Sequence, residues 1–598
     1  MSTNSVRTSI EGEDIRELTP LVNRIIKVAP SKISQIIMCC AITHWFDAET
    51  IAWMGSKEEA ESKRVLNYLV INYTFVRPYP TRGYTYHENV RAAILIKLKT
   101  EDPQYYLELN RRAAAFFEYK TESATVIEEH REFMREQVYH LLPSDEEKGF
   151  QLFLKMYLGA KESNRVSECQ TLLELTEESR RTLSPEYQFQ LCHYWGELYT
   201  GFGKINEAMS WNEEALRIAR EMESNSQIAL INYELGTNYK RIGEFDESLE
   251  LLKESLNRYK CEKGANAQVA EVLLGIAITL TYMDQFDEAA EAYEESLSYS
   301  DEVKHAETKH RIGWLRRIQG RLDESLELHQ EAISKLESLG EVFLKGKALH
   351  SLGNVLAEQH NHEGALDTFA SALEIFERLE AGRHMALAIR DRSWSQFQLG
   401  DVDGALDSVR LAIGQLDRIG DKAGCAGGHL AIGQILLRVG HLEDAEHHLL
   451  TAYTLEQPVA SQYSRVVVNG ELALLMALRH RFDKVEQLAS PVETYAKSND
   501  MHNLEARMKV VRAAVALAQS NLDLAATMFW EALEIACTWN KYFPHDIANK
   551  VAWILRSYAQ GAKPASEIAE KLVSFLGKSK KEALQHINNL LENFSTGG

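Results

Sequence analysis

The stretch LHSLGNVLAEQHNHEGALDTFASALEIF, residues 349–376, decides the fold of this chain. It reads as two helices joined by a polar turn, and the first helix carries a large residue beside a small one, Leu352-Gly353. The second helix has small residues near its start and middle, at Ala365 and Ala372. Small residues at these points let two helices approach closely, which predicts a helical hairpin.

The same skeleton recurs as Leu235-Gly236, Ile312-Gly313 and Ile432-Gly433. The small residue that opens the second helix recurs in steps of 40, 41, 36 and then five times 40 residues, at Ala208, Ser248, Ala289, Ser325, Ala365, Ala405, Ala445, Val485 and Ala525. A fixed period of this size indicates an array in which each pair is stabilised by its neighbours. We therefore predict nine helix pairs over residues 186–545.

The pattern resembles the tetratricopeptide repeat (TPR), whose usual period is 34 residues. Each unit here is about six residues longer, which lengthens its helices by a turn or more at about 3.6 residues per turn. The long period is similar to the repeats of kinesin light chains and of the sensor domains of signalling ATPases. The resemblance implies an all-α, TPR-like α-solenoid that binds a protein or peptide.

The composition agrees with a helical array. At 598 residues the chain exceeds the about 250 to 300 residues at which a single core stops growing. Hydrophobic residues make up 45% and charged residues 26%, which excludes a chain that is disordered as a whole. Only 11 prolines and 33 glycines occur, which favours helices joined by short turns.

Charge and cysteine usage narrow the class further. The net charge of -21 argues against general nucleic-acid binding, because affinity for a phosphate backbone comes from clustered lysine and arginine. The seven cysteines show no zinc or redox spacing and are expected to be reduced core residues. No run of about 18 to 20 apolar residues occurs, and the first residues are polar and acidic. We expect a cytoplasmic protein without a membrane span.

The N-terminal residues follow a different pattern. Three short helices are expected near residues 31–40, 47–54 and 57–70, followed by two extended runs around Thr81-Arg82-Gly83, which is the order of a winged helix. The segment VRPYPTRGYTYHENVRAAIL, residues 76–95, resembles the end of the winged helix in STAND-type signalling ATPases, where a His and then an Arg follow the strands. Those residues would be His87 and Arg91 here.

The ATPase core of that family is missing from the sequence. No GxxxxGK[ST] loop occurs, and Gly577-Lys578-Ser579 has Leu572 where the first loop glycine should stand. The chain resembles the regulatory half of such a protein. The predicted organisation is a flexible N-terminus (1–19), a winged-helix-like domain (20–100), a helical arm (101–185), nine repeats (186–545) and capping helices (546–598), with Pro564 to Phe594 as the cap.

Catalytic motifs are not found either. No HExxH, no GxSxG and no GxGxxG after a strand occurs, so we expect a protein that is not an enzyme and holds no cofactor. Four residues near one turn suggest a metal site, but a solvated helix face is the preferred interpretation: His441, Glu443, His447 and His448.

The repeat register predicts the residues that line the inner groove, at positions two, five, nine, twelve and thirteen of each first helix. In the first six repeats they include Tyr233, Lys240, Arg241, Tyr282, His310, Trp314, Arg317, Lys347, His350, Asn354, Arg390, Trp394 and Phe397. This set is basic and aromatic in an acidic protein, which predicts that an acidic and apolar segment of a partner binds along repeats two to six. The resemblance places at Asn354 an amide that bonds a bound peptide's backbone. The alternative for Trp314 and Trp394 is packing between adjacent helices.

In the later repeats the same positions form an apolar strip: Leu430, Leu437, Val467, Leu474, Ala477, Leu478, Val510, Ala514 and Leu517. Such a strip is not expected to stay exposed to water. Either the C-terminal helices fold back onto it, or a second apolar partner element covers it.

Two functions follow from this organisation. The leading hypothesis is a non-catalytic adaptor, inhibitor or sensor subunit that binds a protein or peptide and regulates a separately encoded effector. The alternative is a ligand- or peptide-responsive transcription regulator whose winged helix binds DNA. The expected recognition helix favours a packing module over DNA contact, since Lys57, Lys63 and Arg64 are balanced by Glu58, Glu59 and Glu61.

Overall fold

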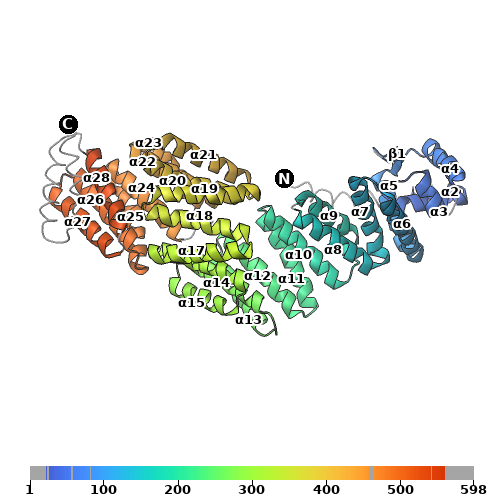
Figure 1. The fold of residues 1–598 in the computed structure, drawn as a ribbon. Helices are drawn as coiled ribbons and strands as arrows, with labels where there is room; N and C mark the ends of the chain where they lie inside the picture. The colour runs from blue at the N-terminus through green and yellow to red at the C-terminus, as the bar shows by residue number, and fades with distance from the viewer. Residues whose placement is uncertain are drawn as a thin grey trace. The chain divides into compact units, whose positions relative to one another are not determined.

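The computed structural model describes residues 20–558, apart from positions 21, 23, 25, 56–57, 81, 164, 457–461 and 540–541. Over these residues the chain is helical except for one two-stranded hairpin and its adjoining bridge, which confirms the predicted class (Figure 1). The chain divides between Leu198 and Tyr199 into two compact units. Among the described helices, none is both long and apolar enough to cross a membrane.

The first unit starts with three helices and a hairpin, in the order that the sequence predicts. The elements are α2 (Ser31–Ile42), α3 (Ala48–Gly55), α4 (Glu59–Asn72), β1 (Val76–Pro78), β2 (Tyr84–Tyr86) and α5 (Glu88–Glu101). The strands pair antiparallel, with Val76 opposite Tyr86. Gly83 allows the tight return, because a Cβ there would lie 2.5 Å from the carbonyl oxygen of Phe46 and its φ is +66°.

Long antiparallel helices follow the hairpin. They are α6 (Pro103–Ser123), α7 (Ile127–Ser144), α8 (Glu146–Glu162), α9 (Val166–Arg180) and α10 (Pro185–Gly201). Helix α6 begins where it does because the Asp102 carboxylate accepts a hydrogen bond from the Tyr105 amide, and proline stands in its first turn.

A buried arginine ties the first helices to the long ones. The Arg91 guanidinium donates to the carbonyl oxygens of Ile42 and Thr43, at 3.2 and 3.3 Å, and to the Tyr139 hydroxyl on α7 at 3.0 Å. That hydroxyl donates in turn to the Glu178 carboxylate on α9 at 2.5 Å. The pKa of the Arg91 side chain is raised above its ordinary value, since Tyr139 and Glu178 outweigh the cost of burial. Arg91 therefore acts here as a structural cation.

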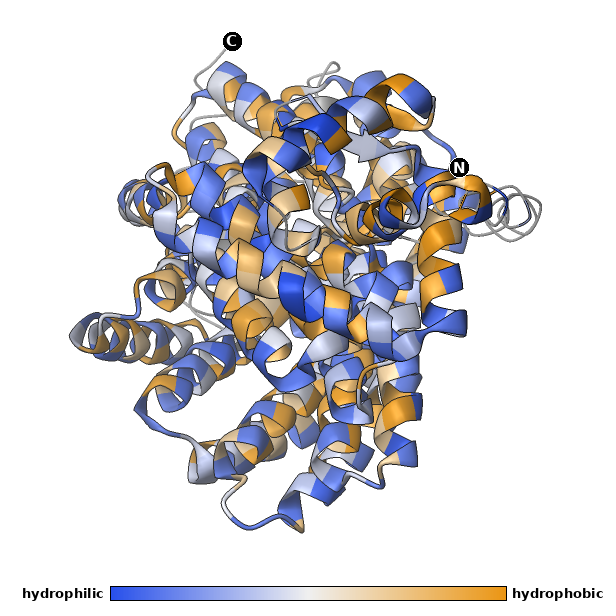
Figure 2. Cartoon of the chain, turned by 90° about the vertical axis from the view of Figure 1, so that its right-hand side faces the viewer, coloured by the Kyte–Doolittle hydropathy of each residue, from blue (hydrophilic) through white to orange (hydrophobic). Residues whose placement is uncertain are grey.

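The second unit starts after Leu198. The elements are α11 (Ile205–Glu221), α12 (Asn225–Ile242), α13 (Phe245–Lys260), α14 (Asn266–Tyr282), α15 (Phe286–Tyr299), α16 (Glu302–Ile318), α17 (Leu322–Leu339), α18 (Val342–Glu358), α19 (His362–Arg378), α20 (Gly382–Gln398), α21 (Val402–Arg418), α22 (Lys422–Val439), α23 (Leu442–Glu456), α24 (Gln462–Leu478), α25 (Phe482–Ser498), α26 (His502–Ala518), α27 (Leu522–Trp539) and α28 (Phe543–Tyr558). Over the described residues the unit contains α11, which corresponds to a B helix, and then eight consecutive antiparallel pairs from α12–α13 to α26–α27, followed by α28. The first helix of each pair is called A and the second B. Figure 2 shows apolar and polar residues alternating along the helices that face the viewer, as expected for helices with one buried face.

Close packing explains why the repeat needs small residues. The nine small residues that open the B helices are all buried, with at most 1% of their surface exposed. In the A helices, a Cβ on Gly353 would lie 2.7 Å from the Phe369 ring, and a Cβ on Gly433 would lie 2.7 Å from Leu449. Each pair therefore sits at a spacing that a larger residue would prevent.

The turn between the A and B helices repeats with the same steps as the small residues. One residue in each turn has a positive φ: Gly203, Gly243, Asp284, Gly320, His360, Gly400, Gly440, His480 and Ser520. The single step of 36 residues, between Asp284 and Gly320, coincides with the shortest B helix, α15, which has 14 residues against 18 in α17. One turn of helix is therefore missing there, and the stacking continues around it.

Most of the apolar strip of the later repeats is buried inside the chain. Its members Leu437, Leu474, Ala477, Val510, Ala514 and Leu517 are at most 8% exposed. Helix α28 packs on α26 and α27 and adds Ile547, Val551 and Ile554 to the same core. Helix α28 therefore covers the last part of the strip, on α26, whereas Leu430, Val467 and Leu478 remain partly exposed. The predicted cap from Pro564 to Phe594 lies outside the described residues.

Candidate binding groove

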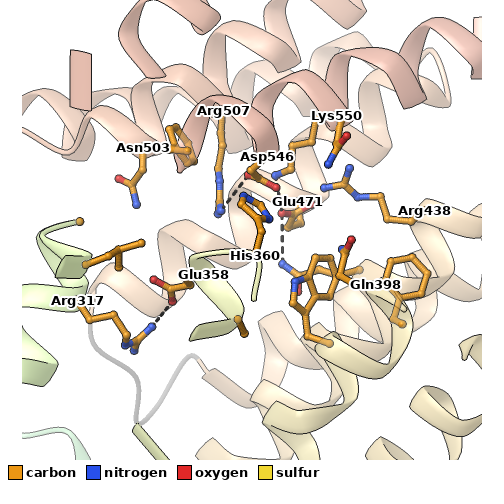
Figure 3. A pocket seen from close by; sticks show the side chains of 18 of the residues that line it. Arg317, Glu358, His360, Gln398, Arg438, Glu471, Asn503, Arg507, Asp546 and Lys550 are labelled. Carbon is orange, nitrogen blue, oxygen red and sulfur yellow. Dashed lines mark hydrogen bonds and ion pairs between the residues drawn. The ribbon is translucent and has the colours of Figure 1, made fainter. Parts of the chain in front are cut away.

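The A helices form the inner layer of the second unit. A cavity of about 660 Å³ is lined mainly by side chains from α16, α18, α20, α22, α24, α26 and α28. These helices are separated along the chain by their B partners, so they can surround one space only if they share the concave side (Figure 3).

The thirteen residues predicted for the groove lie on five consecutive A helices. Tyr233, Lys240 and Arg241 are on α12, Tyr282 is on α14, His310, Trp314 and Arg317 are on α16, Lys347, His350 and Asn354 are on α18, and Arg390, Trp394 and Phe397 are on α20. Three of them, Arg317, Trp394 and Phe397, line the cavity.

Aromatic side chains follow the groove in two groups. The Tyr282 and Trp314 rings lie 5.8 Å apart, and Tyr282 also stacks on Phe245 at 5.7 Å. The Trp394 and Phe397 rings lie 5.4 Å apart, and both pack partly against the large C-terminal core. Both interpretations of Trp394 therefore hold: its ring packs between helices, and it also lines the cavity.

Three predicted residues converge on one carboxylate, Asp391. His350 Nε2 lies 2.8 Å from it, the Asn354 amide donates to it at 3.2 Å, and the Arg390 guanidinium donates to it at 2.7 Å. Burial would raise the pKa of Asp391, but Arg390 and then His350 hold it well below its ordinary value. The Asn354 amide, which the resemblance assigns to a bound peptide, is therefore engaged within the chain.

His310 lies inside its own repeat and not on the groove surface. It is 4% exposed, and its Nδ1 lies 3.2 Å from Nδ1 of His329 on the paired helix α17. Burial, followed by the neighbouring His329 and Arg311, lowers the pKa of His310 well below its ordinary value. His310 is thus a neutral packing residue at neutral pH.

Two cations on α12 and α16 have no hydrogen-bond or ion-pair partner within the described chain. The side chains of Lys240 and Arg311 form neither a hydrogen bond nor an ion pair there, and the Nε atom of Arg311 is buried. Burial, then Arg311 and Arg241, lowers the pKa of Lys240 to about 8. Lys347, whose Nζ lies 3.7 Å from Glu307, has its pKa lowered to about 8 by burial and by Arg311. Arg311 is the centre of this basic cluster.

Sequence reasoning missed Arg311, although a signal was present. It follows His310 directly, and an apolar or polar stripe on a helix is wide enough to include residues beside the predicted positions. The register also places three polar residues at inner positions of the later repeats: Gln434 at position nine, Arg438 at position thirteen and Arg507 at position two. Most other inner positions of those repeats are apolar, so the sequence pattern there predicts an apolar strip. No signal marked Asp546 and Lys550, because α28 lies beyond the last repeat pair.

Two ion pairs, one of them buried, join α28 to the inner helices around the cavity. Lys550 Nζ lies 3.3 Å from Glu471 on α24, and Arg507 on α26 lies 3.5 Å from Asp546. The Gln434 amide donates to Glu471 at 3.3 Å. Burial lowers the pKa of Lys550 to about 8. Burial would raise the pKa of Asp546, but Lys550 and then Arg507 hold it at about 2.

The residue before α28 contacts the turns of the middle repeats. The Tyr542 hydroxyl donates to Asp323 at 2.9 Å, and His360 Nε2 donates to the Tyr542 carbonyl oxygen at 3.1 Å. These residues are 219 and 182 positions apart in the chain. Tyr542 therefore lies directly against the middle repeats, at the edge of the cavity that His360 lines.

Within the ranges that the structure describes, no group of three or more His, Cys, Asp or Glu side chains is arranged to hold a metal ion. In the cluster of His441, Glu443, His447 and His448, His448 Nδ1 lies 2.9 Å from Nδ1 of His429 on the preceding A helix, α22.

Comparisons with known proteins agree with a repeat array. Residues 227–302, which span α12 to α15, match the family model described as Tetratricopeptide repeat. No curated protein matches the sequence.

Several solved structures are similar to the chain at low identity. A Rap protein complexed with Competence and Sporulation Factor is 13% identical over 61% of this chain and 99% of its own, with a TM-score of 0.46. The quorum sensor NprR from B. thuringiensis is 13% identical over 60% and 99%, with a TM-score of 0.43. A STAND protein with a tetratricopeptide repeat sensor from Pyrococcus horikoshii is 12% identical over 86% and 64%, with a TM-score of 0.33.

Proposed function

We propose that the chain is a non-catalytic interaction module that binds an acidic, apolar segment of a partner protein along the concave face of α12 to α20, and so regulates a separate effector. The observation that carries the proposal is the pair of cations without partners, Lys240 and Arg311. Two of the other groove cations are compensated within the chain: Arg317 is paired with Glu358, and Arg390 with Asp391.

Uncompensated cations have a defined energetic effect in this place. A charge that is removed from water without a counter-ion destabilises the chain, and an anion brought beside it removes that cost. The chain as a whole carries a charge of -21, so a basic groove also attracts a complementary segment selectively. Carboxylates of a partner are the natural counter-ions for this cluster.

The aromatic groups supply the apolar part of the proposed contact. Tyr282 remains 38% exposed beside Trp314, so its ring is open to a bound side chain. Tyr and Trp contribute large contact areas at a small loss of side-chain freedom, and they dominate the energetics of many interfaces. An alternation of acidic and apolar side chains in the partner would satisfy both features.

We propose the same domain organisation that the sequence predicts: a head (20–100), an arm (101–185), repeats (186–545) and a cap (546–598). We propose the head as a winged-helix-type packing module, supported by the way Arg91 ties α5 to α7. The exposed face of α4 supports packing over DNA contact, because Lys63 is paired with Glu59 at 2.8 Å.

The proposal is tested with fluorescent peptides of equal length in which apolar residues alternate with either acidic or basic residues. Fluorescence polarisation should show binding of the acidic peptides that weakens as salt is raised, because screening weakens the attraction between charges. The double variant Lys240→Gln, Arg311→Gln should reduce the affinity at least about tenfold, as each lost charged contact contributes about 1.5 to 3 kcal/mol.

A matched control removes the same two charges from the B helices. Lys253→Gln with Arg378→Gln changes exposed residues of α13 and α19 and should leave the affinity unchanged. Equal binding of basic peptides, or full affinity in the Lys240 and Arg311 double variant, would contradict the groove assignment.

A further inference from the structure

The cavity beneath α28 has the size and walls of a small-molecule site. Its volume of about 660 Å³ falls within the range of about 300 to 1,000 Å³ found for ligand pockets. Trp394 and Phe397 of α20 form one wall, and Phe543 and Trp553 of α28 contribute another. Lys240 and Arg311, which carry the proposed peptide groove, are not part of its lining.

The charges around the cavity do not balance. Its lining holds three carboxylates, and each has a cation of its own: Glu358 pairs with Arg317, Glu471 with Lys550 and Asp546 with Arg507. The fourth cation, Arg438, has no carboxylate partner within the described chain. Its guanidinium lies over the Trp553 ring, 5.4 Å from the centroid.

The hydrogen bonds of the cluster are incomplete as well. Three buried polar atoms have no hydrogen-bond partner in the described chain: Glu471 Oε2, Arg507 Nε and Asp546 Oδ2. Glu471 is only 4% exposed, so its free oxygen is cut off from bulk water. Buried polar groups are almost always satisfied, and each exception needs a reason. Figure 3 shows these side chains converging with Arg438 and Lys550 on one side of the cavity.

We propose that this cavity binds one small organic anion, a carboxylate or phosphate carried on a flat apolar body. Arg438 supplies the counter-ion, and the Trp394 and Trp553 rings cover the apolar body. The free Oε2 atom of Glu471 accepts a hydrogen bond from an N–H or O–H group of the ligand.

The anion has two possible sources with the same chemistry: a free metabolite or an acidic, aromatic end of the partner segment. The cavity shares Arg317, Trp394 and Phe397 with the predicted peptide groove, but its lining does not include Lys240 or Arg311, whose charges carry the peptide proposal.

Two probes that differ in charge alone test the site. Isothermal titration calorimetry with the full chain should show that indole-3-acetate binds one to one and at least about tenfold more tightly than the uncharged indole-3-acetamide. In Arg438→Gln this preference should disappear. Arg438→Lys, which keeps the charge, should retain most of the preference, so a loss seen only in Arg438→Gln is due to the lost charge and not to a misfolded cavity.

The control variant is Arg410→Gln on α21, an exposed arginine that pairs only with its helix neighbour Asp407. It should bind like the wild type, as should the double variant Lys240→Gln, Arg311→Gln, so failure of the peptide groove and failure of this site are distinguishable. Competition by the acidic peptides would identify the partner segment as the source of the anion, and simultaneous binding would identify a free small molecule. Absence of binding by indole-3-acetate, or an unchanged preference in a folded Arg438→Gln, would overturn the proposal.

Discussion

At the scale of single residues, the inner face is governed by how each charge is compensated. Asp391 is contacted by three cationic or polar side chains. Glu471 lies 3.3 Å from Lys550, and both side chains are at most 6% exposed. Lys240 forms no hydrogen bond or ion pair in the described chain, and Glu271 compensates its charge only weakly. Because burial penalises a charged form, these positions respond to pH and to ligands far more than exposed lysines do.

Lys240 should make ligand binding depend on pH. Its pKa in the free chain is about 8, below its ordinary value, and an adjacent carboxylate would raise that pKa. Binding of an acidic peptide should therefore take up protons near pH 8 to 9, and the affinity should fall as the pH rises through that range. Calorimetry in buffers of different ionisation enthalpy measures the proton uptake.

Lys240→Arg is the matched control, since arginine stays charged throughout this range and should abolish the uptake attributable to this position. A pH-independent affinity in the wild type between pH 7 and 9.5 would contradict the assignment of Lys240 to the site.

Glu471→Gln should destabilise the second unit by about 3 to 5 kcal/mol at pH 7, the cost of leaving a buried charge without its partner. The folded pKa of Lys550, about 8 in the wild type, would fall further. The unfolded chain then binds more protons than the folded one up to the ordinary lysine pKa, so stability should recover as the pH rises. Urea unfolding at pH 7 and pH 9 measures both effects.

The comparison variant is Glu443→Gln, whose side chain is 90% exposed. It should change the stability by less than about 0.5 kcal/mol. An equally small effect at Glu471 would show that the ion pair with Lys550 contributes little.

At the scale of elements, the helix pairs depend on close approach at defined glycines. Gly353 faces the fully buried ring of Phe369, whereas Gly414 lies on the exposed side of α21, where a Cβ would have no neighbouring atom within 4 Å. The two glycines are both in helix interiors, so they share the same intrinsic helix propensity and differ in packing alone.

The same substitution should therefore have opposite effects at these two sites. Gly353→Ala brings a methyl group to 2.7 Å from the Phe369 ring, and overpacking of about 1 to 3 kcal/mol should exceed the gain in helix propensity. Gly414→Ala should stabilise by about 0.5 to 1 kcal/mol. Thermal unfolding midpoints of the two variants should move in opposite directions, and a shift of the same sign would show that the pair spacing is adaptable.

At the scale of the whole molecule, the chain consists of two compact units, and the second is closed by its own last described helix. In repeat arrays each pair contacts mainly its neighbours, so a local defect spreads along the array before it affects a separate unit. The inward face of α28 is part of the large C-terminal apolar core.

A charge placed inside that core should release α28. Ile547→Asp puts a carboxylate at a fully buried position and should remove hydrogen-exchange protection from residues 462–558, while residues 26–198 keep theirs. Mass spectrometry of exchanged peptides measures this. Asn549→Asp adds the same charge at an exposed position of the same helix and should leave the protection unchanged. Loss of protection in both units would contradict their independence.

The repeat register was available from the sequence because it depends on local chemistry. Small residues at Ala365 and Gly353 are required wherever two helices touch, and they recur whenever the pair recurs, so the period could be counted and the inner positions named. The buried His310 shows the limit of that reasoning: a position in a register does not state how far a side chain is tilted toward the paired helix, where His329 lies.

The sequence by itself therefore determined the all-α class and the 40-residue step, and it predicted which positions of each A helix face inward. Only the tertiary structure decided which inner charges are paired and which are free. The partners of Arg507 and Glu471 are on α28, and Tyr542 reaches Asp323 across 219 residues. Periodicity reports contacts between neighbours in the array, whereas these contacts depend on how far the solenoid curves, which is the sum of many small packing angles.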